Sequence, residues 1–221
     1  MVRYILAAAL SFLLVNPASV HAQDDPDAIQ LRASKLIDST MASLNIRAKR
    51  FNQELAIINA VNPLETSSLT KENIAKTREK IKDFLGYLEV YRSLSVKLKE
   101  EMTDSVNTLR AKMPSRHRPT FLQEFLDAYE LDQGTFDKYT LALTKLYTNI
   151  DAVVAFIQTS NVTIKDNRFQ FSDKKEYDKY TELMAPVEKS NRKLISASAN
   201  SQKATMDASE IMQKAYGQIK K

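Results

Sequence analysis

Apolar side chains recur three or four residues apart along most of this chain, and this periodicity constrains the fold more than any other feature. The clearest stretch follows Thr120 and contains Leu122, Phe125, Tyr129, Phe136, Tyr139, Leu143, Leu146, Ile150, Val153 and Ile157. Such spacing puts apolar residues on one face of a helix and favours helices that pack at shallow angles. Only 3 of the 221 residues are glycine, which disfavours a turn-rich β fold. The sequence therefore predicts an all-α protein.

Three further helices are predicted from the same periodicity. The first begins at Pro26, because proline suits the first helical position, and ends at Asn62-Pro63. The second begins near Thr70 and stops before Pro114. The last begins near Ser172 and Asp173, with Asp173 and Glu176 as a capping pair. The stripe of the first helix contains Ile29, Leu36, Leu44, Phe51, Leu55 and Ile58, with Ala33, Thr40 and Ala48 in smaller slots.

Between the third and fourth helices the period changes from helical to alternating. Residues 162–165 and 168–171 each alternate apolar and polar side chains around Asp166-Asn167, which predicts a β-hairpin with a two-residue turn. Pairing Ile164 with Phe169, and Val162 with Phe171, puts all four apolar side chains on one face. Because a lone hairpin is unstable in water, we expect this face to lie on the end of the bundle, near the turn between the first two helices.

Short connections between the helices favour antiparallel neighbours. We therefore expect an elongated, antiparallel, up-down-up-down four-helix bundle in which residues 23–221 form one domain. The pattern weakens after Ile195, so residues 196–221 are expected to form a loosely attached C-terminal helix. The alternative is a three-helix core from which the fourth helix is partly detached.

Residues 1–22 have the pattern of a cleaved signal peptide. Arg3 precedes an apolar run from Ile5 to Val15, and Val20-His21-Ala22 places permissive residues at the cleavage site. The run of about 11 residues is shorter than the ~20 that a spanning helix needs. We expect cleavage near Ala22 and a periplasmic or secreted protein. No later stretch is expected to span a membrane.

The sequence contains few residues suited to catalysis or metal binding. It has no cysteine, and after residue 22 its one histidine is His117. A single histidine excludes a multi-histidine zinc site and the di-metal site of ordinary helical bundles, because each of these needs at least two histidine ligands. We therefore expect no catalytic, metal or cofactor site and no enzymatic activity. Glu124, Asp127 and Glu130 are interpreted as helix-end charges. Asp132 interrupts the third stripe, where Leu131 is expected to fill the gap.

The charge distribution argues against a nucleic-acid partner. The net charge is +5, but basic and acidic residues are mixed along the chain, whereas nucleic-acid binders concentrate positive charge on one face. Two small basic clusters, Arg47/Lys49/Arg50 and Lys112/Arg116/His117/Arg118, are interpreted as solvated surface.

Length, export and the lack of catalytic motifs favour a non-enzymatic helical bundle that binds or scaffolds another macromolecule, most simply a protein. This hypothesis predicts exposed apolar residues on the last helix or its tail. The alternative is a carrier or sensor of a small apolar or lipid ligand. The aromatic stripe of Phe121, Phe125, Tyr129, Phe136, Tyr139 and Tyr147 would then line its pocket.

Overall fold

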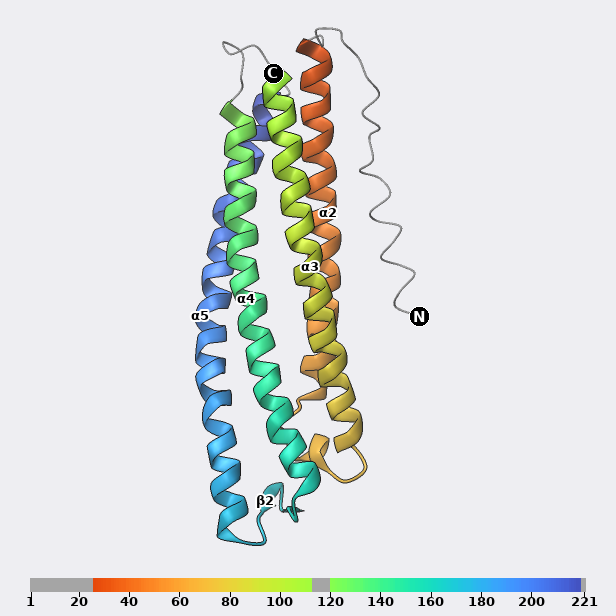
Figure 1. Ribbon diagram of the computed structural model, residues 1–221, viewed down its shortest axis with the longest axis vertical. Coiled ribbons are helices and arrows are strands. Elements are labelled where there is room, and N and C mark those ends of the chain that lie inside the picture. The colour runs from red at the N-terminus through yellow and green to blue at the C-terminus, as the bar shows by residue number, and fades with distance from the viewer. Residues whose placement is uncertain (1–25, 113–119, 220–221) are drawn as a thin grey trace.

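The computed structural model describes residues 26–112 and 120–219, and four long helices account for most of them. Its elements are α2 (Pro26–Val61), η1 (Thr66–Leu69), α3 (Ile74–Lys112), α4 (Thr120–Thr159), β1 (Thr163–Lys165), β2 (Arg168–Gln170) and α5 (Lys174–Ile219). The helices lie side by side along the longest axis (Figure 1). The predicted all-α bundle with a small β-hairpin is confirmed. The expected signal peptide and His117 lie outside the described residues.

The ends of α2 follow from local chemistry. The helix begins at Pro26 and ends at Val61, as the sequence predicts. Asn62 then adopts φ 44°, a left-handed conformation that asparagine tolerates and that commonly ends helices. The start of α3 differs, because Thr70 precedes a turn and the helix begins at Ile74. The Thr70 carbonyl oxygen accepts hydrogen bonds from the amides of Asn73 (3.1 Å) and Ile74 (2.9 Å).

The hairpin has the predicted register, with Ile164 opposite Phe169. Asp166 and Asn167 have φ values of 52° and 56°, as a two-residue hairpin turn requires. The described ladder covers three residue pairs, so the expected pairing of Val162 with Phe171 falls beyond it. The Phe169 ring packs against Tyr180, with centroids 5.9 Å apart. The hairpin thus rests on the beginning of α5.

The capping pair at the start of α5 is confirmed, and one of its members also fastens the hairpin. The Glu176 amide donates a hydrogen bond of 2.9 Å to Asp173 Oδ1. The Glu176 carboxylate accepts hydrogen bonds from the Asn161 amide (3.0 Å) and from the Ser172 hydroxyl (2.7 Å) and amide (3.3 Å). Residues on both sides of the hairpin therefore bind one carboxylate. The Ser172 hydroxyl bond, followed by the Asn161 amide bond, lowers the pKa of Glu176.

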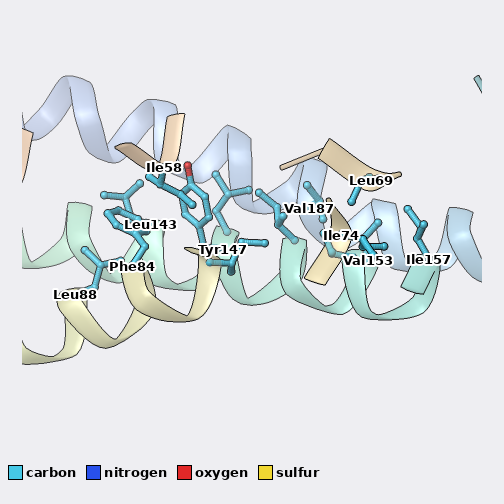
Figure 2. Packing of buried hydrophobic residues seen from close by; sticks show 14 of the residues in the cluster. Ile58, Leu69, Ile74, Phe84, Leu88, Leu143, Tyr147, Val153, Ile157 and Val187 are labelled. Carbon is cyan, nitrogen blue, oxygen red and sulfur yellow. The ribbon is translucent and has the colours of Figure 1, made fainter. Parts of the chain in front are cut away.

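The core consists of two apolar clusters stacked along the bundle. The upper cluster, toward the beginning of α2 in Figure 1, has as members Ile29, Ile37, Val106, Leu122, Phe125, Tyr129, Ala208 and Met212. The lower cluster includes Ile58, Leu69, Phe84, Leu88, Leu143, Tyr147, Val153, Ile157 and Val187 (Figure 2). Every long helix contributes to both clusters, so burial of apolar surface is the main force that holds the four together.

The inward face of α5 carries small residues where it packs on the bundle. Ser190, Ser201, Ala204 and Ala208 are buried, and small side chains let helix backbones approach closely. The segment from residue 196 continues α5 without a break. Met212, near its end, belongs to the upper cluster. The loose attachment of residues 196–221 stays a prediction.

The helix α4 corrects one expectation about membranes. By length and composition it is apolar enough to cross a membrane, whereas no segment after residue 22 was expected to be. The helix α4 also contributes more buried residues to the bundle than α3, including Phe125, Leu143 and Val153. The central helix of a soluble bundle meets the same test of length and composition.

Candidate functional site

A layer of polar side chains separates the two apolar clusters. Its members are Arg47 from α2, Ser95 from α3, Asp132 and Gln133 from α4, and Thr205 from α5, and we call them the polar layer. Ser95 and Gln133 are 2% and 4% exposed, respectively. Because a buried polar group without a hydrogen-bond partner is costly, the partners of these side chains determine what the layer does.

Arg47 is the cation of the polar layer. Its guanidinium donates hydrogen bonds to the Ser95 hydroxyl and to Gln133 Oε1, the latter at 3.5 Å. It also lies over the ring of Tyr91, with Cζ 4.8 Å from the centroid, an attractive cation–π geometry. Arg47 takes part in none of the described ion pairs. Its charge is stabilised by these hydrogen bonds and by the tyrosine ring, and it also acts on the carboxylate of Asp137.

Gln133 connects this cation to the carboxylate of the layer. Its Nε2 donates a hydrogen bond of 3.0 Å to Asp132 Oδ2, while its Oε1 accepts from Arg47. Asp132 Oδ1 accepts a hydrogen bond of 2.6 Å from the Thr205 hydroxyl. A continuous chain of hydrogen bonds therefore runs from α2 through α4 to α5, with Ser95 of α3 attached to Arg47. Hydrogen bonds thus join all four helices at this level, and the link to α5 lies at the surface, because Thr205 is exposed.

Tyr91 and Tyr129 border the polar layer, and its charges affect their pKa values. Burial raises the pKa of Tyr91 and of Tyr129, and the charge of Arg47 with its side-chain hydrogen bonds acts in the opposite direction. Asp137, one turn further along α4, also has a pKa raised by burial, which the charge of Arg92 opposes most. These groups sit in a partly desolvated part of the bundle.

The polar layer can fix how the four helices are aligned along one another. One guanidinium, one amide, one carboxylate and two hydroxyl groups satisfy one another. Across the described residues, no group of three or more His, Cys, Asp and Glu side chains is arranged to hold a metal ion. A satisfied network of this kind favours one alignment of the helices, because any shift of register would leave its members unpaired.

Arg47 differs from the sequence-based prediction, in which it is solvated surface and Ala48 belongs to the apolar stripe. Arg47 instead is half-buried and occupies the slot between Leu44 and Phe51, and Ala48 is exposed. The spacing of three and four residues from these neighbours was the available signal. An arginine fits there because its aliphatic stem packs while its head finds polar partners.

The polar position on α4 also differs from expectation. Asp132 is partly buried and belongs to the layer, but Leu131, which was expected to fill the gap in the stripe, is 46% exposed. Gln133 fills it. The periodicity does not predict a buried glutamine here, because an amide in an apolar stripe is favourable only when Arg47 and Asp132 are both close enough to bind it.

Two of the three acidic residues near the start of α4, which the sequence pattern suggested were helix-end charges, contact other side chains. Asp127 Oδ1 accepts a hydrogen bond of 2.6 Å from Gln123, and Gln123 in turn accepts one from Arg110 of α3. Glu130 forms an ion pair of 3.8 Å with Lys99. Glu124 is exposed. The structure therefore disperses these carboxylates among separate partners.

The aromatic side chains pack against one another. Phe51 of α2 lies between α3 and α4, and its ring centroid is 4.9 Å from that of Phe136 and 5.4 Å from that of Tyr91. Tyr87 and Tyr139 complete this group. A shallow surface pocket of about 370 Å³ lies elsewhere, at charged residues of α3 and Gln158 of α4. Arg78 in that pocket binds Asp151 at 2.9 Å.

The outward part of α5 carries large apolar side chains that the bundle does not cover. Tyr177, Ile195 and Met206 are 55%, 63% and 69% exposed. Intervals of 18 and 11 residues put them on one line along the helix. Helical spacing places Tyr177 in line with Tyr180 and Met184 and predicts a core position for it, but in the structure its ring is exposed and packs against Phe171, at 5.7 Å between centroids. We call the line of Tyr177, Ile195 and Met206 the outer edge of α5.

Comparison of the chain with protein-family models, curated proteins and solved structures finds no match.

Proposed function

We propose that this chain is an exported, non-enzymatic helical-bundle protein that binds or scaffolds another protein. The observation that carries the proposal is the outer edge of α5, where Ile195 and Met206 each expose more than 60% of their surface. Exposed apolar side chains in line on one helix gain free energy when a partner covers them. Export follows from residues 1–22, whose pattern is that of a periplasmic or secreted precursor.

The proposal includes the antiparallel, up-down-up-down arrangement of the helices. The order of colours along neighbouring helices in Figure 1 supports it. It also includes the hairpin as a cover at the end of the bundle. Phe169 of the hairpin packs on the same lower cluster as Leu64 and Leu69 from the connection between α2 and α3, which supports that position.

The first experiment is native mass spectrometry of the protein purified gently from the compartment to which its host exports it. We expect a chain that begins at Gln23 and is bound to another protein. The matched variants are Ile195→Ser/Met206→Ser and the control Val90→Ser/Val96→Ser, which removes exposed apolar side chains from α3 instead. The complex should be lost in the first variant and kept in the second. A bare monomer under all conditions would contradict the proposal.

A carrier or sensor of a small apolar or lipid ligand is the alternative proposal. One observation favours it: the Tyr87 hydroxyl is buried and, among the described residues, has no hydrogen-bond partner. It lies beside the aromatic group around Phe51. The same mass spectra test this proposal, because a small molecule that co-purifies with the chain and is lost in Tyr87→Phe would support it.

A further inference from the structure

We infer that the outward face of α5 is a docking surface for an acidic amphipathic helix of a partner protein. The inference rests on the proposed function and specifies the partner's chemistry. The first observation that supports it is the spacing of exposed residues along α5. Arg192, Ile195, Ala199, Gln202 and Met206 follow one another at intervals of three, four, three and four residues, and all five are exposed.

Alternating intervals of three and four form a seam that fits another helix at a shallow crossing angle. A seam of the same kind on the inward side of α5, through Ser190, Leu194, Ala197, Ser201, Ala204 and Ala208, packs within the bundle, with four of its members buried. The helix α5 therefore has two seams, of which the fold covers one. Ile195, Ala199 and Met206 supply the apolar positions of the outer seam.

The charge of this segment of α5 favours an acidic partner. It carries four exposed cations, Lys189, Arg192, Lys193 and Lys203, and its only carboxylates are the bordering Glu188 and Asp207, so residues 188–207 have a net charge of +2 (four cations and two carboxylates). The carboxylate-free stretch between these two covers roughly 25 Å of helix. None of the four cations takes part in the ion pairs of the described residues. Carboxylates that flank an apolar stripe on a partner helix would complement them.

A lipid surface fits this face less well than a helix does. Membrane-bound helices gather their apolar side chains into one broad face that enters the acyl region. Ile195 and Met206 instead lie three turns apart, with the polar Gln202 between them. A partner helix can place one side chain against each of them.

Photo-cross-linking of the full chain in its own host tests the inference. The photoreactive residue p-benzoylphenylalanine is placed at Ala199, the centre of the seam, and in a second preparation at Ile57, an exposed apolar position on α2. Mass spectrometry then identifies the cross-linked segment. We expect the Ala199 probe to label a protein segment that is predicted to be helical and has net negative charge.

Charge reversal gives the decisive comparison. Arg192→Glu/Lys203→Glu should lower the yield of this cross-link by about tenfold, because two attractions become repulsions. The control Lys138→Glu/Lys145→Glu changes two exposed cations of α4 and should leave the yield unchanged. Circular dichroism shows that both variants are folded.

The other outcomes overturn the inference in distinguishable ways. A basic segment, a lipid or a nucleic acid at Ala199, or equal yields from the two charge variants, would exclude an acidic helix. Labelling of a protein from Ile57 alone would leave the proposed function standing and reject this surface. Labelling of no protein from either position would reject both.

Discussion

The side chain of Gln133 lies between the guanidinium of Arg47 and the carboxylate of Asp132 and is hydrogen-bonded to both. Replacing it by leucine keeps a similar volume but leaves Arg47 and Asp132 each without one partner. We expect Gln133→Leu to lower the free energy of unfolding by about 1–3 kcal/mol, the usual cost of unsatisfied buried polar groups. Urea denaturation measures it.

Gln53→Leu is the matched control, because Gln53 is an exposed glutamine of α2. Its effect should stay within about 0.5 kcal/mol. Equal stability of both variants and the parent would mean that the polar layer does not hold the helices together.

Individual residues show what the sequence could and could not reveal about the candidate site. Its pattern flagged Asp132, because a carboxylate interrupted a long apolar stripe. It did not reveal that Arg47 from another helix lies at the same level, since periodicity gives the direction of a side chain but not the relative heights of helices. That height depends on packing across all four helices, which no local pattern encodes.

The hairpin and α5 are fastened by the Glu176 carboxylate, so their contact should depend on pH. The pKa of Glu176 is lowered from the ordinary value of 4.5 by its hydrogen bonds. A lowered pKa in the folded state stabilises that state above pH 4.5, and the contribution is lost as pH falls through the folded pKa.

Ser172→Ala removes the largest cause of this lowering, the Ser172 hydroxyl. We expect the pKa of Glu176 to move up toward 4.5, as measured by a pH titration of its carboxyl carbon by NMR. Thr181→Ala, which removes an exposed hydroxyl from the next turn, should not change it. An unchanged pKa in Ser172→Ala would show that the backbone amides alone bind the carboxylate.

The two seams of α5 should respond differently to added volume. Ala204 is 6% exposed and lies on the inward face, so Ala204→Leu forces side chains into a packed interface. We expect a loss of about 1–3 kcal/mol in the free energy of unfolding. Ala199→Leu, on the exposed seam, should cost roughly 0.5 kcal/mol or less. Thermal unfolding of both variants checks this, and a similar loss in both would show that the outward face is also packed.

Whole helices were the most predictable part of the molecule. Pro26 and Asn62-Pro63 mark the ends of α2, and Asp166-Asn167 sets the hairpin turn, because each uses backbone conformations that few residues favour. The start of α3 was misplaced by four residues because the η1 segment and its turn take up Thr70. The exposed edge of α5 could be anticipated only in general, since exposure depends on which helices lie beside it.

At the scale of the whole molecule, buried tyrosines make the fold sensitive to alkali. Burial raises the pKa of Tyr147 from 10.0 to about 12. A raised pKa stabilises the folded state fully below pH 10, and this contribution is lost as pH rises through 12.

Tyr147→Phe has no proton to lose at this position. It should therefore lose stability less steeply than the parent between pH 10 and 12, although it gives up a hydrogen bond of 3.2 Å to Asn59. Urea denaturation across this pH range measures the slope. Tyr177→Phe is the control, because Tyr177 is exposed. Parallel curves for Tyr147→Phe and the parent would show that other tyrosines account for the alkaline loss.

The stacking of two apolar clusters on either side of one polar layer also bears on how this sequence can change over time. The clusters share no buried residue, and substitutions that are not in contact combine nearly independently. Each apolar cluster can therefore accept substitutions that are compensated by other substitutions within the same cluster. The residues of the polar layer cannot be substituted independently of one another, because each of them has a hydrogen-bond partner on a different helix.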